Sequence, residues 1–321
     1  MSTTSKWLGS VDGDARKRML LGIGSFLLPL LVWCLVSYVP FVWHPKVHVI
    51  DPGGVDYFQV DMLVDKTMFA DEVANMEREH LAVPTGKSAN PIYLPAPDQV
   101  ARAFYNGFVN PPQSKDVPSM PASLWHSIQI IFWGFLISSI VGVPLGILSG
   151  TYTLMGRLSE PFIEFFRYLP APAFGALAVA ILGIYDGPKI AIIVIGTLFQ
   201  QVLIIANTTR KLEVTLIEAA RTLGTRNIKL LSKVVVPGIL PDLYRDQRIL
   251  LGWAWTYLIV AELIGTSSGI TWFITQQARY QHFDNVYAAI MTIGIIGFGT
   301  DLILARLGRR LFPWDRTQDR R

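Results

Sequence analysis

Three long stretches of this 321-residue chain contain no aspartate, glutamate, lysine or arginine. The longest, 117–156, has 40 residues, and the other two, 19–45 and 190–209, have 27 and 20 residues. The hydrocarbon core of a bilayer is about 30 Å thick, and a helix of roughly 20 apolar residues crosses it. The sequence therefore predicts an all-α membrane protein with several spans. Its charged fraction of 16%, against about 25% in soluble domains, agrees with this prediction.

The apolar segments predict six transmembrane helices, at about 19–43, 124–150, 160–184, 189–208, 248–266 and 286–308. Pro170 and Pro172 interrupt the third span, so we expect a short amphipathic helix up to Tyr168, a prolyl bend and then the span proper. The first span is too long for the apolar region of a cleaved signal peptide. The single cysteine, Cys34, excludes an intrachain disulfide and leaves the redox compartment open.

Lysine and arginine collect on one side of this predicted topology. With the N-terminus inside, 20 basic residues lie inside and eight outside, and six of those eight lie in one long loop. Because cytoplasmic loops carry the excess of basic residues, we expect both termini in the cytoplasm. The chain then divides into a cytoplasmic segment 1–18, a first transmembrane helix 19–43, an extracytoplasmic loop or subdomain 44–120, a transmembrane domain 121–308 with a cytoplasmic loop 209–247, and a cytoplasmic tail 309–321.

The cytoplasmic loop contains two short helical patterns. Apolar and small residues recur at helical spacing over 212–220, and Gly224 stands where a C-cap is expected. Thr225 can cap a second helix, which we expect Pro237 to end. Small residues near the tip would let the cleft of a partner approach the backbone closely. A solvated hairpin that only links two spans explains the same periodicity.

The residues of this loop have a specific spacing. Glu218-Ala219-Ala220 is followed after three residues by Gly224 and after nine more by Val234-Val235-Val236-Pro237. This resembles the EAA signature of ABC importer permeases, with Val234 and Val236 in place of the usual Ile and Leu. Other segments resemble elements of nitrate/sulfonate/taurine-type permeases: Leu94-Pro95-Ala96-Pro97, Arg167-Tyr168-Leu169-Pro170, 255–262, Gly294-Ile295-Ile296-Gly297 with Asp301, and Phe312-Pro313-Trp314.

The resemblance implies the type I ABC importer permease architecture in a bacterial inner membrane, surrounded by lipid. It implies a subunit that is not an enzyme, binds no cofactor or nucleic acid, and works with separate ATPase subunits that use ATP and Mg²⁺. An extracytoplasmic solute-binding protein and a second permease copy, as a homodimer, are the other implied partners. The residues that the resemblance assigns to ATPase coupling are Glu218, Ala219, Ala220, Arg221, Gly224 and Pro237.

The solute that the resemblance implies is a small oxyanion or organic anion such as nitrate, a sulfonate or taurine. The alternative is a stand-alone secondary transporter or channel, which would need coupling ions at broken midplane helices and inverted repeats. The two halves of the sequence show no convincing repeat.

Five polar residues within or beside the spans are candidates for a translocation path. Gln200, Gln201 and Asn207 could hydrogen-bond to an oxyanion or only join helices. Glu262, near the outer end of the fifth span, could gate the outer vestibule, pair with a cation or pack against a neighbouring helix. Arg167 could attract an anion or anchor its helix at the lipid headgroups.

Two features predict helix packing. Gly134, Gly142 and Gly146 keep one face of the second span small, which permits close approach of another helix. Asp301, toward the inner end of the sixth span, is five residues before Arg306, and we expect these two residues to form a local ion pair.

Two apparent motifs fail. Residues 84–88 end like a P-loop, but Leu81 stands where the pattern needs glycine, and no apolar strand precedes it. The spacing of His44 and His48 suits metal ligands on a helix, yet Pro45 lies between them. We therefore expect no metal site and no catalytic site.

The segment 44–91 is an insertion that the resembled family lacks. Its first part, 47–64, is typical of short strands around a turn at Pro52-Gly53-Gly54, and 65–81 is typical of an amphipathic helix. The apolar side of that helix would comprise Met68, Phe69, Val73 and Met76. A small outer subdomain follows, which could dock a binding protein, buttress the vestibule or be passive.

Overall fold

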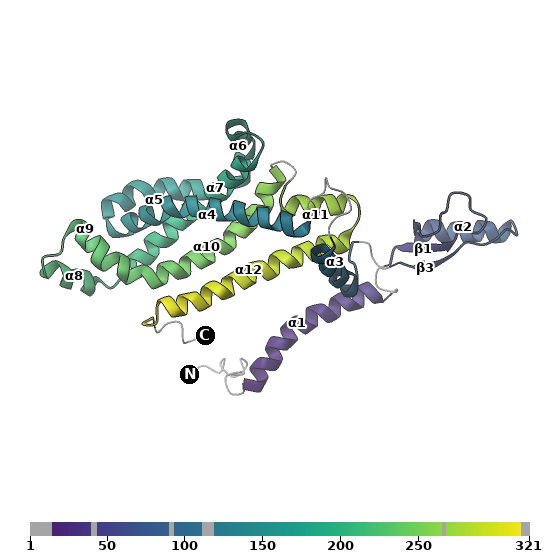
Figure 1. The fold of residues 1–321 in the computed structure, drawn as a ribbon, viewed down its shortest axis with the longest axis horizontal. Helices are drawn as coiled ribbons and strands as arrows, with labels where there is room; N and C mark the ends of the chain where they lie inside the picture. Colours follow the sequence, from purple (N-terminus) through teal and green to yellow (C-terminus); the bar gives the residue numbers. More distant parts are fainter. Residues whose placement is uncertain (1–14, 40–43, 90–92, 111–118, 265–267, 316–321) are drawn as a thin grey trace, which may run out of the picture. The chain divides into compact units, whose positions relative to one another are not determined.

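The structure, a computed structural model, describes residues 15–39, 44–89, 93–110, 119–264 and 268–315 (Figure 1). The chain divides into two compact units, Met1–Asn106 with Gln277–Ala288, and Gly107–Gln276 with Ala289–Arg321. The helices are α1 (Ala15–Tyr38), α2 (Lys66–Arg78), α3 (Pro97–Val109), α4 (Met120–Thr151), α5 (Thr153–Arg167), the short 3-10 helix η2 (Ala171–Phe174), α6 (Gly175–Leu182), α7 (Asp186–Arg210), α8 (Val214–Thr222), α9 (Asn227–Leu230), the π-helical turn η3 (Leu231–Val235), α10 (Val236–Ile264), α11 (Ile270–Arg279) and α12 (Phe283–Leu311).

Four of the described helices, α1, α4, α7 and α12, are long and apolar enough to cross a membrane. Helix α5 and the segment Ala171–Leu182 make a fifth span if they are taken together, with a bend of 86° between them. The bend lies at Pro170 and Pro172, as predicted. The remaining predicted span, 248–266, falls largely on α10, which carries Arg248 and Glu262 and does not meet the same test. Its residues 265 and 266 lie outside the described residues, and the six-span count stays a prediction.

Glycines on one face of α4 bring α7 close to it. A Cβ atom added at Gly134 would lie 2.7 Å from the side chain of Ile193, and one added at Gly146 would lie 2.8 Å from Ile205. The close helix packing predicted from these glycines is therefore confirmed. Helix α10 completes this core, in a buried cluster that comprises Ile147, Ile205, Val235, Ile239 and Leu243.

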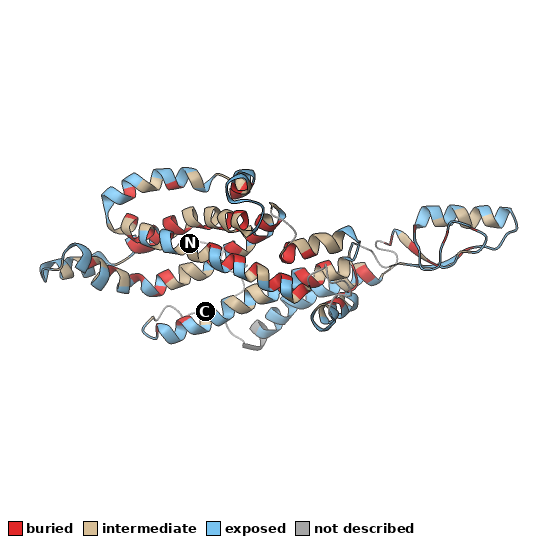
Figure 2. Cartoon of the chain, turned by 45° about the horizontal axis from the view of Figure 1, so that its top comes forward, coloured by how far each residue is buried: buried red, intermediate tan, exposed pale blue. Residues whose placement is uncertain are grey.

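Many residues along the same helices are exposed (Figure 2), and large apolar residues are among them. Examples are Phe132 and Ile140 on α4 and Phe298 and Ile303 on α12, each more than half exposed. Exposed apolar surface of this extent is typical of helices that face lipid or another subunit.

The insertion forms a small α/β subdomain. Strands β1 (Lys46–Asp51), β2 (Leu63–Asp65) and β3 (Thr85–Ser88) form an antiparallel sheet in the order β2-β1-β3. The segment 84–88 that ends like a P-loop thus supplies a strand, with Ser88 opposite Val47. Outside this insertion the described residues contain no strand, so the predicted all-α class describes the rest of the chain.

The subdomain has a core of its own, which comprises Val49, Val55, Phe58 and Val64 with Phe69 and Met76 packed against it. The predicted amphipathic helix is α2, and Phe69 and Met76 lie on its inner side as expected. Met68 is 45% exposed, so its predicted place on that side is wrong. Interaction with the Glu72 carboxylate of α2 raises the pKa of the Tyr57 hydroxyl, which lies between β1 and β2.

Candidate functional site

Helix α8 ends in a left-handed glycine. Gly224 has φ +83°, its N–H donates to the Arg221 carbonyl at 3.0 Å, and the Thr225 N–H donates to the Ala220 carbonyl at 3.0 Å. These two bonds form a Schellman motif, in which glycine adopts a conformation that other residues rarely adopt. The C-cap predicted at Gly224 is confirmed.

The surface of α8 and of the turn after it is exposed. No residue of α8 is buried, and Glu218, Ala219 and Gly224 are all exposed. Leu223 and Ile228 flank the glycine with exposed fractions of 86% and 77%. Two large, exposed apolar side chains beside small residues are typical of a surface that a partner covers.

The second helix of this loop differs from the prediction in two ways. Its N-cap is Arg226 rather than Thr225, and Pro237 does not end it. Helical backbone continues from Asn227 through α9 and the π turn η3 into α10. Pro237 lies in the first turn of α10, where its lack of an N–H is tolerated after the widened π turn. The second helix of the loop and α10 are therefore parts of one continuous helix, from Asn227 to Ile264.

The five candidate path residues do not form one site. Gln201 is fully buried and joins three helices: its Oε1 accepts from Ser138 at 2.7 Å, and its Nε2 donates to Ser139 at 2.9 Å and Gln247 at 2.7 Å. Asn207 is exposed and accepts a 3.3 Å hydrogen bond from Arg210, one turn further along α7.

Arg167 and Gln200 do come together. Both line a small cavity next to the bend after α5, together with Trp253 and Tyr257 of α10. Two of the five candidates therefore share one hollow.

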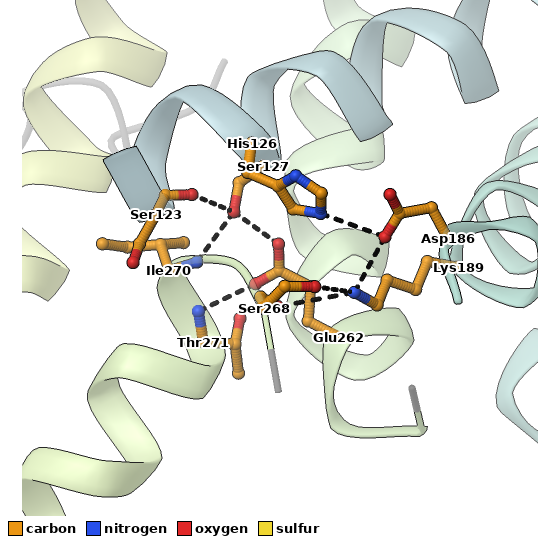
Figure 3. A network of polar contacts seen from close by, with 9 residues as sticks. All are labelled: Ser123, His126, Ser127, Asp186, Lys189, Glu262, Ser268, Ile270 and Thr271. Atoms are coloured by element: carbon orange, nitrogen blue, oxygen red, sulfur yellow. Dashed lines mark hydrogen bonds and ion pairs between the residues drawn. The ribbon is translucent and has the colours of Figure 1, made fainter. Parts of the chain in front are cut away.

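Glu262 is a buried hydrogen-bond acceptor (Figure 3). One carboxylate oxygen contacts the Ser127 hydroxyl of α4, and the other accepts from the Thr271 N–H at 2.8 Å. The Ser127 oxygen in turn accepts from the Ile270 N–H at 2.8 Å. The carboxylate therefore caps the first turn of α11 and fastens it to α4. The absence of a side chain at Gly269, whose φ is +100°, leaves room for this carboxylate.

Lys189, which was not among the predicted site residues, approaches Ser268, two residues before α11 (Figure 3). Its side chain is 0% exposed, and its Nζ donates to the Ser268 hydroxyl at 2.6 Å and to Asp186 at 3.1 Å. Asp186 also contacts His126 at 3.0 Å. A buried charge needs such partners, and here they hold the turn before α11 against α7. The only sequence signal was a lysine that begins an otherwise apolar run.

The predicted Asp301–Arg306 pair is wrong. Asp301 accepts hydrogen bonds from Arg248 of α10, at 2.8 and 2.9 Å. Residues five apart on a helix point in different directions, whereas a neighbouring helix can present an arginine directly. The bidentate pair therefore links α10 to α12.

Comparison with known proteins gives consistent matches. Residues 142–313 match the model of the binding-protein-dependent transport system inner membrane component family. The taurine transport system permease protein of Escherichia coli is 30% identical over 236 residues, which cover 72% of this chain and 84% of that protein. The putative aliphatic sulfonates transport permease protein of Bacillus subtilis is 32% identical over 199 residues, which cover 61% of this chain and 72% of that protein. These matches confirm the resemblance to nitrate/sulfonate/taurine-type permeases.

The fold is similar to a solved structure of the MetNI methionine ABC transporter in an inward-facing conformation. The TM-score is 0.53 at 19% identity, over 58% of this chain and 93% of that one. At this identity the likeness shows the fold alone.

Proposed function

Because this chain belongs to the inner membrane components of binding-protein-dependent transport systems, we propose that it forms the translocation path of an ATP-driven importer. The observation that carries the proposal is the exposed, glycine-capped helix α8, which a four-residue turn joins to the continuous helix formed by α9, η3 and α10. In this proposal the chain hydrolyses nothing, and separate ATPase subunits consume ATP and Mg²⁺.

The proposed coupling surface comprises Glu218, Ala219, Ala220, Arg221 and Gly224, with Pro237 at the junction to α10. An ATPase subunit that binds α8 would cover Leu223 and Ile228, which otherwise stand in water. Because α9, η3 and α10 are continuous, a displacement that the turn at Gly224 passes from α8 to α9 would tilt α10 with it. This is how closure of an ATPase dimer would open and close the path.

The same proposal sets the topology and the other partners. Both termini and the loop 209–247 lie in the cytoplasm, as the distribution of basic residues favours, and the subdomain 44–120 lies outside. The exposed apolar faces of the spans contact lipid and a second copy of the chain, and an external solute-binding protein delivers the solute.

The solute in this proposal is a small organic anion or oxyanion. The two relatives are named for taurine and aliphatic sulfonates, and both compounds carry a sulfonate group. The path candidates Arg167, Gln200, Gln201, Asn207 and Glu262 then differ in role: Gln201 and Glu262 hold helices together, while Arg167 and Gln200 line a small cavity.

A pair of matched glycine variants tests the coupling surface. Gly224 and Gly183 have φ +83° and +82°, and an added Cβ meets nothing within 4 Å at either position. Aspartate therefore imposes the same backbone strain at both, but only Gly224 lies in the proposed contact. We expect Gly224→Asp to lose the ATPase subunits when the tagged chain is purified in mild detergent, and Gly183→Asp to retain them. Equal retention by both variants would contradict the proposed coupling surface.

A further inference from the structure

The bend after α5 creates a small cavity within the helical unit. Its volume is about 30 Å³, and it is lined by Arg167 from α5, Gln200 from α7, and Trp253 and Tyr257 from α10. Roughly 10–15 Å³ of such volume holds one water molecule, so this cavity has room for about two waters and can receive oxygens of an oxyanion group but not a whole organic solute. Interrupted helices at membrane depth are tolerated where they line such a cavity, and transporters bind solutes there.

The polar side chains around this cavity lack partners. Within the described ranges, no acceptor lies within hydrogen-bond distance of the Gln200 amide, the Trp253 indole N–H or the Tyr257 hydroxyl. The neighbouring Gln201 does not line this cavity, and its side chain makes three hydrogen bonds. None of the three side chains is fully buried, and that of Trp253 is 42% exposed, so these donors are accessible to a ligand that accepts hydrogen bonds.

The charge at the cavity is positive. Arg167 is exposed: its guanidinium lies 4.8 Å from the centre of the adjacent Tyr168 ring and donates to that hydroxyl at 3.0 Å, and no described carboxylate lies within 4 Å of it. Arginine stays protonated and offers five N–H donors in a fork that matches the oxygens of an oxyanion. An arginine without an acidic partner, beside three neutral donors, favours an anion over a cation or an uncharged group.

A glycine holds the cavity in shape. A Cβ atom at Gly196 of α7 would lie 2.8 Å from three atoms of the Tyr257 ring. The missing side chain thus lets the phenol lie against α7, next to Gln200.

We propose that Arg167, Gln200 and Tyr257 form the subsite of the translocation path that binds the sulfonate or other oxyanion group of the solute during its passage. This inference rests on the proposed function, because it takes the solute to be an anion that passes through this chain. The rest of the solute extends from the cavity into the path.

The test is transport by the complete complex, purified with its ATPase subunits and supplied with its solute-binding protein in proteoliposomes. The probes are labelled taurine, ethanesulfonate and nitrate, and the quantity measured is probe imported per ATP hydrolysed. We expect Arg167→Gln to lower this ratio about tenfold to hundredfold, because a hydrogen bond to a charged group is lost. The KM should not change, since the binding protein captures the solute first, and Arg167→Lys should restore part of the ratio.

One control and one further probe of the Tyr257 ring complete the test. Arg157→Gln removes an exposed arginine from the same helix, outside the cavity, and should transport like the unaltered protein. Gly196→Ala should lower transport as Tyr257→Phe does, because the added methyl group displaces the ring.

Normal transport by Arg167→Gln would overturn the subsite while leaving the importer proposal intact. Loss of ATP hydrolysis in Arg167→Gln would also overturn it, because the arginine would then act in assembly. If the unaltered complex imports none of the three probes, the proposed solute class and the subsite both fall.

Discussion

Two neighbouring glutamines of α7 have opposite surroundings. Gln201 is fully buried and satisfied by Ser138, Ser139 and Gln247, whereas the Gln200 amide faces a cavity without a partner. We expect Gln201→Leu to cost about 2 kcal/mol of stability, because buried partners are left unsatisfied. Gln200→Leu should leave stability nearly unchanged and lower transport. Thermal unfolding midpoints of the two detergent-purified variants measure the difference, and equal midpoints would contradict these roles.

For single residues, the sequence predicted which polar side chains lie near or within the spans, but not what each of them contacts. It indicated Gln200, Gln201 and Arg167 as polar groups near or within the spans. The helical periodicity of α7 did not show which of the two glutamines contacts α4 and α10. The sequence placed Lys189 at the edge of a span, because its burial depends on Ser268, which is 79 residues away, as well as on Asp186 of the same helix. The partner of Asp301 also comes from another helix, and sequence distance carries no information on such pairs.

The packing of α4 on α7 depends on residues that lack side chains. A Cβ at Gly146 would lie 2.8 Å from Ile205 and 2.9 Å from the Val202 carbonyl, while one at Gly294 of α12 meets nothing within 4 Å. We expect Gly146→Val to destabilise the protein by about 1–3 kcal/mol through overpacking, and Gly294→Val to have little effect. Folded yield and thermal unfolding in detergent test this pair. Equal tolerance of both substitutions would mean that these helices do not pack as described.

Three structural features that depend on a short local sequence were predicted correctly. The Gly224 C-cap, the prolyl bend after α5 and the amphipathic helix α2 each follow from one or two residues whose conformational preference is strong. Pro237 misled the prediction because proline is compatible with the first turn of a helix, and the π turn before it is not visible in the residue pattern. The consequence is functional, since the helix that Pro237 was expected to end continues as α10.

At the scale of the whole molecule, the insertion is a removable module. Its core is its own, and its ends meet: the Ala89 N–H donates to the Lys46 carbonyl at 2.9 Å. We expect a chain that lacks 46–88 to fold and to hold its ATPase subunits with unchanged basal ATP hydrolysis. Stimulation of that hydrolysis by the solute-binding protein is the second readout; it falls if the module docks this partner and stays the same if the module is passive. Failure of the shortened chain to fold would contradict the independence of the module.

The central claim is that this chain is a permease driven by a separate motor subunit. The most direct measurement is ATP hydrolysis by the tagged chain purified from its native membranes in mild detergent. We predict hydrolysis that accompanies a second polypeptide and is lost when Glu218 or Gly224 is altered, since both lie on the exposed coupling surface of α8. A lone polypeptide without ATP hydrolysis that still performs ion-driven uptake in liposomes would contradict the claim and identify a secondary transporter.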